Sequence, residues 1–311
     1  MSFAGKVKEE LLGQTGKARH CQLAELAVLF AICGQVIMEE DGTCQIKFET
    51  ENLTVAKKCY MLVRRAFHIV PDISVSGNHQ YALYLLGEQD AMAFMKAVRV
   101  EEGALLVADR LLERSCCKRA FLRGLFLTSG SVTDPRSGYH LELAAGSSAR
   151  AARIQEMIRI FGLEAKIVER KRNYIVYMKE GEAIVDFLNV IGAHVALMEF
   201  ENVRILKEMR NSINRQVNCE TANIKKTVSA ASRQTADIHY IHDTIGFGNL
   251  SENLSQIAKL RLEYPDVTLK ELGQMLEPPI GKSGVNHRLR KLSEIAEDLR
   301  LQGGKHDKEE Y

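Results

Sequence analysis

The hydrophobic and polar positions of the first 195 residues form the same pattern twice. An apolar helical segment at 23–34 is followed by two strand-like segments, an amphipathic helix, two further strand-like segments and a short helix. The second copy begins at 118–130 and repeats this order. Asp41-Gly42 is a typical hairpin turn, which favours antiparallel pairing. Each copy therefore predicts the order α-β-β-α-β-β-α, and two copies related by a pseudo-twofold axis predict one α+β domain.

Further changes in pattern divide the rest of the chain. A basic segment after the repeats predicts one long helix or two consecutive helices, and three short helices follow it. The polar, glycine-rich C-terminus predicts disorder. The expected parts are an N-terminal helix at 1–20, the α+β domain at 21–195 with repeats at 21–100 and 116–195, a helical linker at 196–248, a helix-turn-helix domain at 249–302 and a disordered tail at 303–311.

Small residues recur along the opening helix of each repeat. Gly124, Thr128 and Ser129 lie near one face of the second helix, and the first helix has a similar set in Ala24, Ala27, Ala31 and Gly34. Residues three and four apart share a helix face, and small side chains let two backbones approach closely. The pair predicts a mutual helix interface, with two ordinary core helices as the alternative.

The C-terminal segment has the pattern of a helix-turn-helix. Ser251 is a candidate N-cap of its first helix, and Thr268 with Glu271 has capping-box spacing at the second. A turn with two prolines and two glycines follows, and the last helix is expected to begin near Ser283. Its apolar stripe consists of Val285, Leu289, Leu292, Ile295, Ala296 and Leu299.

Hydrogen-bond donors occupy the opposite side of that last helix. Such groups in the first half of a recognition helix contact base edges, and lysine and arginine bind phosphates. A helical interaction module with a solvated basic face is the alternative. The candidates for base contacts are Ser283, Asn286, His287 and Arg290. The candidates for phosphate contacts are Lys282, Arg288 and Lys291, with Arg210, Arg215, Lys225 and Lys226 from the linker.

Composition indicates an ordinary globular protein, with 46% hydrophobic and 26% charged residues and a net charge of +2. No apolar run is long enough to span a membrane, and the N-terminus lacks a signal peptide, so we expect a cytoplasmic, nucleoid-associated protein. The seven cysteines contain no CxxC pair and predict reduced core residues. His239 and His242 predict a solvated or packed pair. We expect no metal site and no cofactor.

Two short stretches resemble the LAGLIDADG signature of homing endonucleases. They are "LRGLFLTSG" in the second repeat and, more weakly, "LAVLFAICG" in the first. In those enzymes an acid before the last glycine binds the catalytic metal, but Cys33 and Ser129 stand there in this chain. Asp134 has no counterpart in the first repeat. The resemblance implies the fold without the ligands that Mg²⁺ requires.

The strands of the two repeats differ in charge. An enzyme that holds a duplex on its sheets needs basic strands in both halves. The second half has Lys166, Arg170, Lys171 and Arg172. The first half has Lys47 among the acids Glu39, Glu40, Asp41, Glu49 and Glu51. A different binding partner for the first sheet, such as a protein, is therefore expected.

Over nearly its full length the chain resembles the WhiA family of bacterial regulators. The runs that carry the resemblance are "FLRGLFLTSGSVTDP", "MRNSINRQVNCETANIKKTVSAA" and "SGVNHRLRKL". It implies a catalytically silent endonuclease-like domain, a DNA-reading helix-turn-helix, and regulation of transcription tied to cell division and, in spore formers, sporulation. The expected partners are promoter DNA and, through the N-terminal domain, RNA polymerase or another regulator. An active metal-dependent endonuclease and a protein-interaction scaffold are the alternatives.

Overall fold

The computed structural model describes residues 1–40, 42–77, 80–99, 107–171 and 173–306. Its contacts divide the chain into two compact units, Met1–Glu208 and Met209–Tyr311. No helix in the described part of the chain is both long and apolar enough to cross a membrane. Each unit has its own apolar core.

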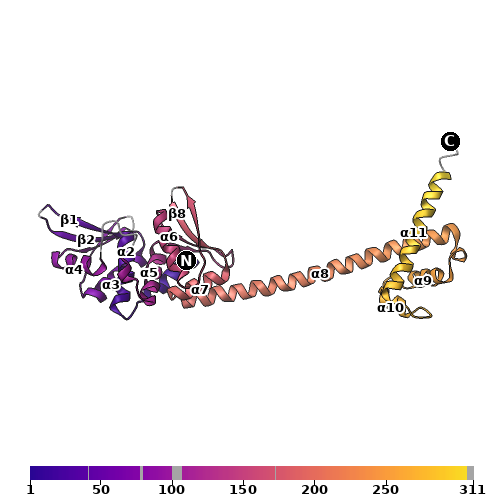
Figure 1. Ribbon diagram of the computed structural model, residues 1–311, viewed down its shortest axis with the longest axis horizontal. Coiled ribbons are helices and arrows are strands. Elements are labelled where there is room, and N and C mark those ends of the chain that lie inside the picture. Colours follow the sequence, from indigo (N-terminus) through magenta and orange to yellow (C-terminus); the bar gives the residue numbers. More distant parts are fainter. Residues whose placement is uncertain (41, 78–79, 100–106, 172, 307–311) are drawn as a thin grey trace. The chain divides into compact units, whose positions relative to one another are not determined.

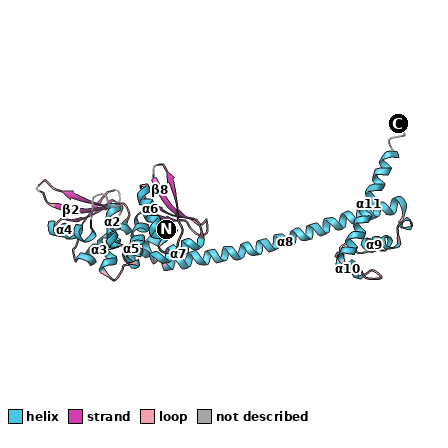
Figure 2. Ribbon diagram, in the orientation of Figure 1, coloured by secondary structure: helices cyan, strands magenta, loops and turns pink. Residues whose placement is uncertain are grey.

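The first unit contains the predicted repeat. After α1 (Phe3–Gly13), the first copy consists of α2 (Arg19–Cys33), β1 (Gly34–Met38), β2 (Cys44–Thr50), α3 (Leu53–Phe67), β3 (Asp72–Ser76), β4 (Gln80–Leu85) and α4 (Glu88–Val98). After the 3-10 turn η1 (Asp109–Leu111), the second copy consists of α5 (Ser115–Ser129), β5 (Gly130–Val132), β6 (Leu141–Ala144), α6 (Ser148–Arg159), β7 (Lys166–Arg170), β8 (Asn173–Met178) and α7 (Gly181–Ile191). The order α-β-β-α-β-β-α is thus confirmed in both copies (Figures 1 and 2).

The two sheets have the same topology. Their strand orders are β1-β2-β4-β3 and β5-β6-β8-β7, and all neighbours are antiparallel. Tyr84 of β4 lies opposite Lys47 of β2, and its counterpart Tyr177 of β8 lies opposite Glu142 of β6. Helices α3 and α4 pack on the first sheet, and α5 and α6 pack on the second. The predicted α+β fold is therefore confirmed.

The interface between the two opening helices is also confirmed. Helices α2 and α5 form the most extensive helix–helix contact of the described residues, with Ala24 and Ala27 buried in it. At Gly124 a Cβ atom would lie 2.5 Å from Val28 Cγ1 and 3.0 Å from the carbonyl oxygen of Glu25. Only glycine allows the two backbones to approach this closely.

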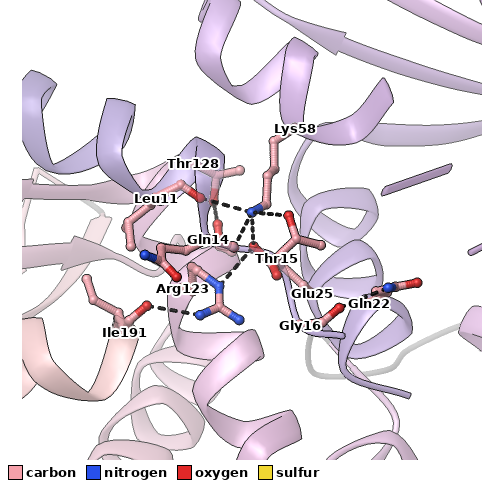
Figure 3. A network of polar contacts seen from close by, with 11 residues as sticks. Leu11, Gln14, Thr15, Gly16, Gln22, Glu25, Lys58, Arg123, Thr128 and Ile191 are labelled. Atoms are coloured by element: carbon pink, nitrogen blue, oxygen red, sulfur yellow. Dashed lines mark hydrogen bonds and ion pairs between the residues drawn. The ribbon is translucent and has the colours of Figure 1, made fainter. Parts of the chain in front are cut away.

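Three charged side chains meet beside this crossing (Figure 3). The Glu25 carboxylate is fully buried, and its Oε1 lies 3.0 Å from Lys58 Nζ and 3.2 Å from Arg123 Nε. Lys58 is also fully buried, and this burial lowers its pKa while the Glu25 carboxylate opposes the change. Glu25 Oε2 has no hydrogen-bond partner among the described residues.

Lys58 and Arg123 also form hydrogen bonds with the backbone of other helices. Lys58 donates to the carbonyl oxygens of Leu11 at 2.9 Å and Gln14 at 2.6 Å, which fixes the end of α1 against α3. Arg123 donates to the carbonyl oxygen of Ile191 at 3.1 Å, which fixes the end of α7 against α5. One buried carboxylate on α2 thus organises helices from both repeats.

The second unit is helical. The chain runs through α8 (His194–Ile245), the 3-10 turn η2 (Phe247–Asn249), α9 (Glu252–Glu263), α10 (Leu269–Gln274) and α11 (Lys282–His306). The predicted linker is a single helix, α8. Its first turns place Ala196 and Phe200 in the first core, and its last turns place Ile238 and Ile241 in the second. The contacts therefore divide the chain within α8, later than the expected end of the first domain at residue 195.

The predicted tail at 303–311 needs a correction at its start. Helix α11 continues to His306, so disorder from residue 303 was the wrong prediction for 303–306. The prediction rested on the polar, glycine-rich composition of the terminus, whereas a glycine in a helix interior costs only about 1 kcal/mol. Residues 307–311 lie outside the described residues.

We predict that Gly124→Val destabilises the first unit by about 1–3 kcal/mol, because the added atoms overlap Val28 and the backbone of Glu25. Urea unfolding followed by circular dichroism measures the change. Gly13→Val is the matched control, since no atom lies within 4 Å of a Cβ there. Equal stability of the two variants would contradict the close crossing.

Candidate nucleic-acid interface

The second unit holds the helices α9, α10 and α11 against the end of α8. Its core is formed by Ile238, Ile241, Leu254, Ile257, Ala258, Leu272, Leu276, Val285, Leu289, Leu292 and Ala296. Arg261 of α9 is also buried, and it donates to Gln234 Oε1 of α8 at 3.1 Å and to the carbonyl oxygen of Val267 at 2.7 Å. The helices of this unit are thus locked by both apolar and polar contacts.

Local signals define where these helices begin. The capping box at α10 is confirmed, with Thr268 Oγ1 accepting from the Glu271 N–H and Glu271 Oε2 accepting from the Thr268 N–H. This hydrogen bonding to Thr268 lowers the pKa of Glu271. Ser251 stands at the N-cap of α9, as predicted, although its side chain makes no capping hydrogen bond.

The turn between α10 and α11 packs closely on α10. The N–H of Ile280 donates to the carbonyl oxygen of Gly273 at 2.9 Å. A Cβ at Gly273 would lie 2.2 Å from the carbonyl oxygen of Ile280 and 3.1 Å from Val285 Cγ2. Glycine at this position therefore sets the approach of α11 to α10.

Helix α11 presents its donors to solvent. Val285, Leu289, Leu292 and Ala296 are buried, and at ~100° per residue the candidate base-contacting residues project to the other side. Ser283, Asn286, His287 and Arg290 are all exposed. Of the candidate phosphate-contacting residues, Lys282 and Lys291 are exposed and Arg288 is half-buried.

Charge changes sign along the exposed face of α11. The first three turns carry the donors, whereas Glu294, Glu297 and Asp298 follow on the same face. Arg290 Nε lies 3.1 Å from Glu294 Oε1, and the two side chains are 77% and 57% exposed. An exposed i,i+4 pair contributes only about 0.3–0.5 kcal/mol, so Arg290 can leave Glu294 for a stronger acceptor.

The four basic residues expected from the linker lie on α8, in the second unit. Arg210, Arg215, Lys225 and Lys226 are exposed, and none of them forms an ion pair with another described residue. Arg215 and Lys226 are three helical turns apart and therefore share a face of α8. Such side chains suit a polyanion, since no neighbouring acid neutralises them.

The positions of the nuclease acids hold neutral donors. Cys33 Sγ donates to the carbonyl oxygen of Leu29 at 2.9 Å, and Ser129 Oγ donates to that of Leu125 at 3.0 Å. Both hydrogen bonds lie within the helix that carries the side chain. Asp134 lies in the loop after β5, where it accepts from the Arg136 N–H at 2.8 Å. These groups offer no pair of carboxylates to a hard divalent cation.

The charged side chains of the sheets are partly paired with one another. Lys47 Nζ lies 2.9 Å from Glu49 Oε2, and Arg170 lies 3.7 Å from Glu142. Glu39, Glu40 and Glu51 are exposed, as are Lys166 and Lys171. Asp41 and Arg172 lie outside the described residues. Exposed acids thus stand at both ends of the β1–β2 hairpin, and we call Glu39, Glu40 and Glu51 the acidic rim of the first sheet. Such a charge disfavours phosphate.

One cluster was missed in the sequence. The structure brings together His20, Cys21, Cys116 and Cys117, which come from the two different repeats. The adjacent cysteines at 116 and 117 could have suggested a metal site. No local pattern in the sequence indicates that they lie beside residues 20 and 21, almost one hundred positions earlier. His242, by contrast, contacts the ring of Phe247 at 4.8 Å and Asp243 at 3.1 Å, as a partly packed surface residue does.

Three family models match successive parts of the chain. Residues 19–82 match the WhiA N-terminal LAGLIDADG-like domain, residues 118–210 the WhiA LAGLIDADG-like domain, and residues 213–296 the WhiA C-terminal HTH domain. The helix-turn-helix prediction is thereby confirmed.

Similar proteins match over almost the whole length. A "Probable cell division protein WhiA" of Lachnoclostridium phytofermentans is 50% identical, over 96% of this chain and 100% of that protein. The protein of the same name in Alkaliphilus oremlandii is 47% identical, over 98% and 99%. The crystal structure of full-length DUF199/WhiA from Thermatoga maritima is 26% identical, with a TM-score of 0.59 over 96% of this chain and 99% of that one.

We predict that Gly273→Ala destabilises the second unit by about 1–3 kcal/mol, because the added Cβ atom overlaps the backbone of the turn at Ile280. Gly281→Ala is the control in the same turn, since its Cβ meets no atom within 4 Å. Thermal unfolding of both variants measures the difference. If Gly273→Ala were the more stable of the two, the packing of this turn would be wrong.

Proposed function

Because the chain belongs to the WhiA family, we propose that it is a sequence-specific, double-stranded DNA-binding regulator of transcription without enzyme activity, which acts in the control of cell division. The observation that supports this proposal is the exposed donor face of α11, held over an apolar core. The link to cell division rests on the printed name of the relatives, "Probable cell division protein WhiA".

In this proposal the first turns of α11 read base edges in the major groove. Arginine forms two hydrogen bonds with guanine O6 and N7, and asparagine forms two with adenine N6 and N7. Arg290 and Asn286 have the side chains for these contacts, and Ser283 and His287 supply further hydrogen-bonding groups beside them. The acids that follow at Glu294 and Glu297 limit the contact to the first half of the helix, since they repel phosphate.

Basic residues supply affinity that does not depend on sequence. Lys282, Arg288 and Lys291 lie beside the reading face of α11 and contact phosphates. Arg210, Arg215, Lys225 and Lys226 of α8 add to the attraction of the polyanion. Each phosphate contact releases counterions, so binding weakens steeply as salt rises.

The first unit serves as a frame in this proposal and does not cleave DNA. Metal-assisted hydrolysis needs hard oxygen ligands that hold the ion and lower the pKa of water. Cys33 and Ser129 instead use their hydrogens within their own helices. The acidic rim of the first sheet favours a protein partner over a duplex, and RNA polymerase or another regulator is the partner class we propose.

We predict that Arg290→Ala costs about 1–3 kcal/mol on the preferred duplex and relaxes selectivity at one base position. Lys282→Ala is expected to weaken specific and random duplexes alike and to reduce the slope of log affinity against log salt by about one. Fluorescence anisotropy with a selected duplex and a scrambled one measures both effects.

The control for this pair is Lys96→Ala, which removes an exposed charge from α4 in the first unit and leaves the second unit unchanged. It should bind like the wild type. Equal losses on specific and random duplex for both Arg290→Ala and Lys282→Ala would contradict the assignment of a reading face to α11.

We also predict that the purified chain leaves supercoiled plasmid intact in the presence of Mg²⁺ or Mn²⁺, because no carboxylate pair stands at the motif positions. Agarose electrophoresis after a long incubation detects nicking, with an active endonuclease as the positive control. The alternative is an active nuclease. It would be established by nicking that requires the metal, is abolished by a chelator and elutes with the protein.

A further inference from the structure

The cluster of His20, Cys21, Cys116 and Cys117 stands at the junction of the two repeats. His20 and Cys21 lie in the first turn of α2, and the two other cysteines lie in the first turn of α5. One ligand atom from each residue can be chosen so that all four lie within 4.8 Å of one another. The described residues contain no other such group of histidine, cysteine and carboxylate side chains.

The spacing of these atoms suits a small tetrahedral ion. Nδ1 of His20 lies 3.2 Å from Sγ of Cys117, 3.3 Å from Sγ of Cys21 and 4.0 Å from Sγ of Cys116. In a tetrahedral zinc site, bonds of about 2.3 Å to sulfur and 2.0–2.1 Å to nitrogen place neighbouring ligand atoms roughly 3.5–3.8 Å apart. The three distances from Nδ1 lie within about half an ångström of this spacing, and the pair of atoms farthest apart, at up to 4.8 Å, has to close by about 1 Å.

We propose that these four residues bind a zinc ion in a structural Cys₃His site that joins the two repeats of the first unit. Three thiolates and one imidazole are a usual ligand set of closed, structural zinc sites. Soft sulfur ligands favour zinc over magnesium or calcium, which prefer oxygen. Cys21 and Cys117 are buried, whereas Cys116 is exposed and leaves a path by which the ion enters.

The surroundings of the cluster support bound thiolates. The N-terminal ends of α2 and α5 carry partial positive charge, which stabilises thiolates. Binding of the ion then displaces three thiol protons to solvent, and each sulfur lone pair forms a bond to the metal.

Arg114 adjusts to the ion. Its Nη1 lies 3.2 Å from Nε2 of His20, and a guanidinium only donates, so this nitrogen accepts and the proton sits on Nδ1. With Nδ1 on zinc, the imidazole proton would stand on Nε2, which would then no longer accept from Arg114. Its positive charge remains close to the three thiolates and balances the net negative charge of the site.

This site differs from the metal site of a LAGLIDADG nuclease. Cys21 and Cys33 are twelve residues apart in α2, which is about 18 Å along a helix. The cluster therefore lies at the opposite end of the helix pair from Cys33 and Ser129. The four side chains fill all four coordination positions of a tetrahedral ion. The ion therefore links α2 to α5 and has no open position for catalysis.

The test uses the full chain, purified under reducing conditions, and measures its metal content and its titration with Co²⁺. Tetrahedral cobalt bound by thiolates absorbs in the visible and near-ultraviolet range, and zinc displaces it. We expect about one ion per chain. Cys116→Ser changes an exposed ligand with little risk to folding, and Cys219→Ser on α8 is the control at another exposed cysteine.

Cys116→Ser is expected to weaken cobalt binding at least about tenfold, since even outer-shell changes have effects of this size. A chelator should lower the melting temperature of the wild type and of Cys219→Ser by more than that of Cys116→Ser. Any of three results would overturn the proposal. They are no tetrahedral cobalt spectrum from the reduced wild type, the same affinity in Cys116→Ser as in the wild type, and a disulfide within the cluster in protein kept reduced.

Discussion

The close crossing of α2 and α5 is the constraint on which the first unit depends. Gly124 brings the two backbones together, and the buried Glu25 carboxylate beside it takes its counter-charges from Lys58 and Arg123. Removing one member of a buried ionic group leaves an uncompensated charge at a cost of about 3–5 kcal/mol. Lys58 comes from α3 of the first repeat and Arg123 comes from α5 of the second. Because both cations bind the same carboxylate, the ionic group favours one placement of the two repeats.

The two ends of this helix pair have different chemistry. At the C-terminal ends, Cys33 and Ser129 close hydrogen bonds within their own helices, and neither of these two positions carries a carboxylate. At the N-terminal ends, a histidine and three cysteines gather where positive helix ends favour thiolates. The helix pair thus has different chemistry at its two ends, while the exposed hydrogen-bond donors of α11 lie in the second unit.

Periodic and local features were predictable from the sequence. The small residues at Gly124, the capping box at Thr268 and the apolar stripe of α11 depend on neighbours within a few positions. The repeat was visible because such local patterns occur twice in the same order. The ionic group around Glu25 and the cysteine cluster were not, because their members lie tens of residues apart and carry no periodic signal. Burial of Arg261 was missed for the same reason, since its acceptor Gln234 belongs to another helix.

The central claim is that sequence is read by α11 in the second unit. The most direct measurement is selection of bound duplexes from a random pool, with the wild type and with a variant in which Ser283, Asn286, His287 and Arg290 are all alanine. All four side chains are exposed, so the fold is kept. We predict that the wild type enriches one motif and the variant enriches none. Enrichment of the same motif by both proteins would contradict the claim.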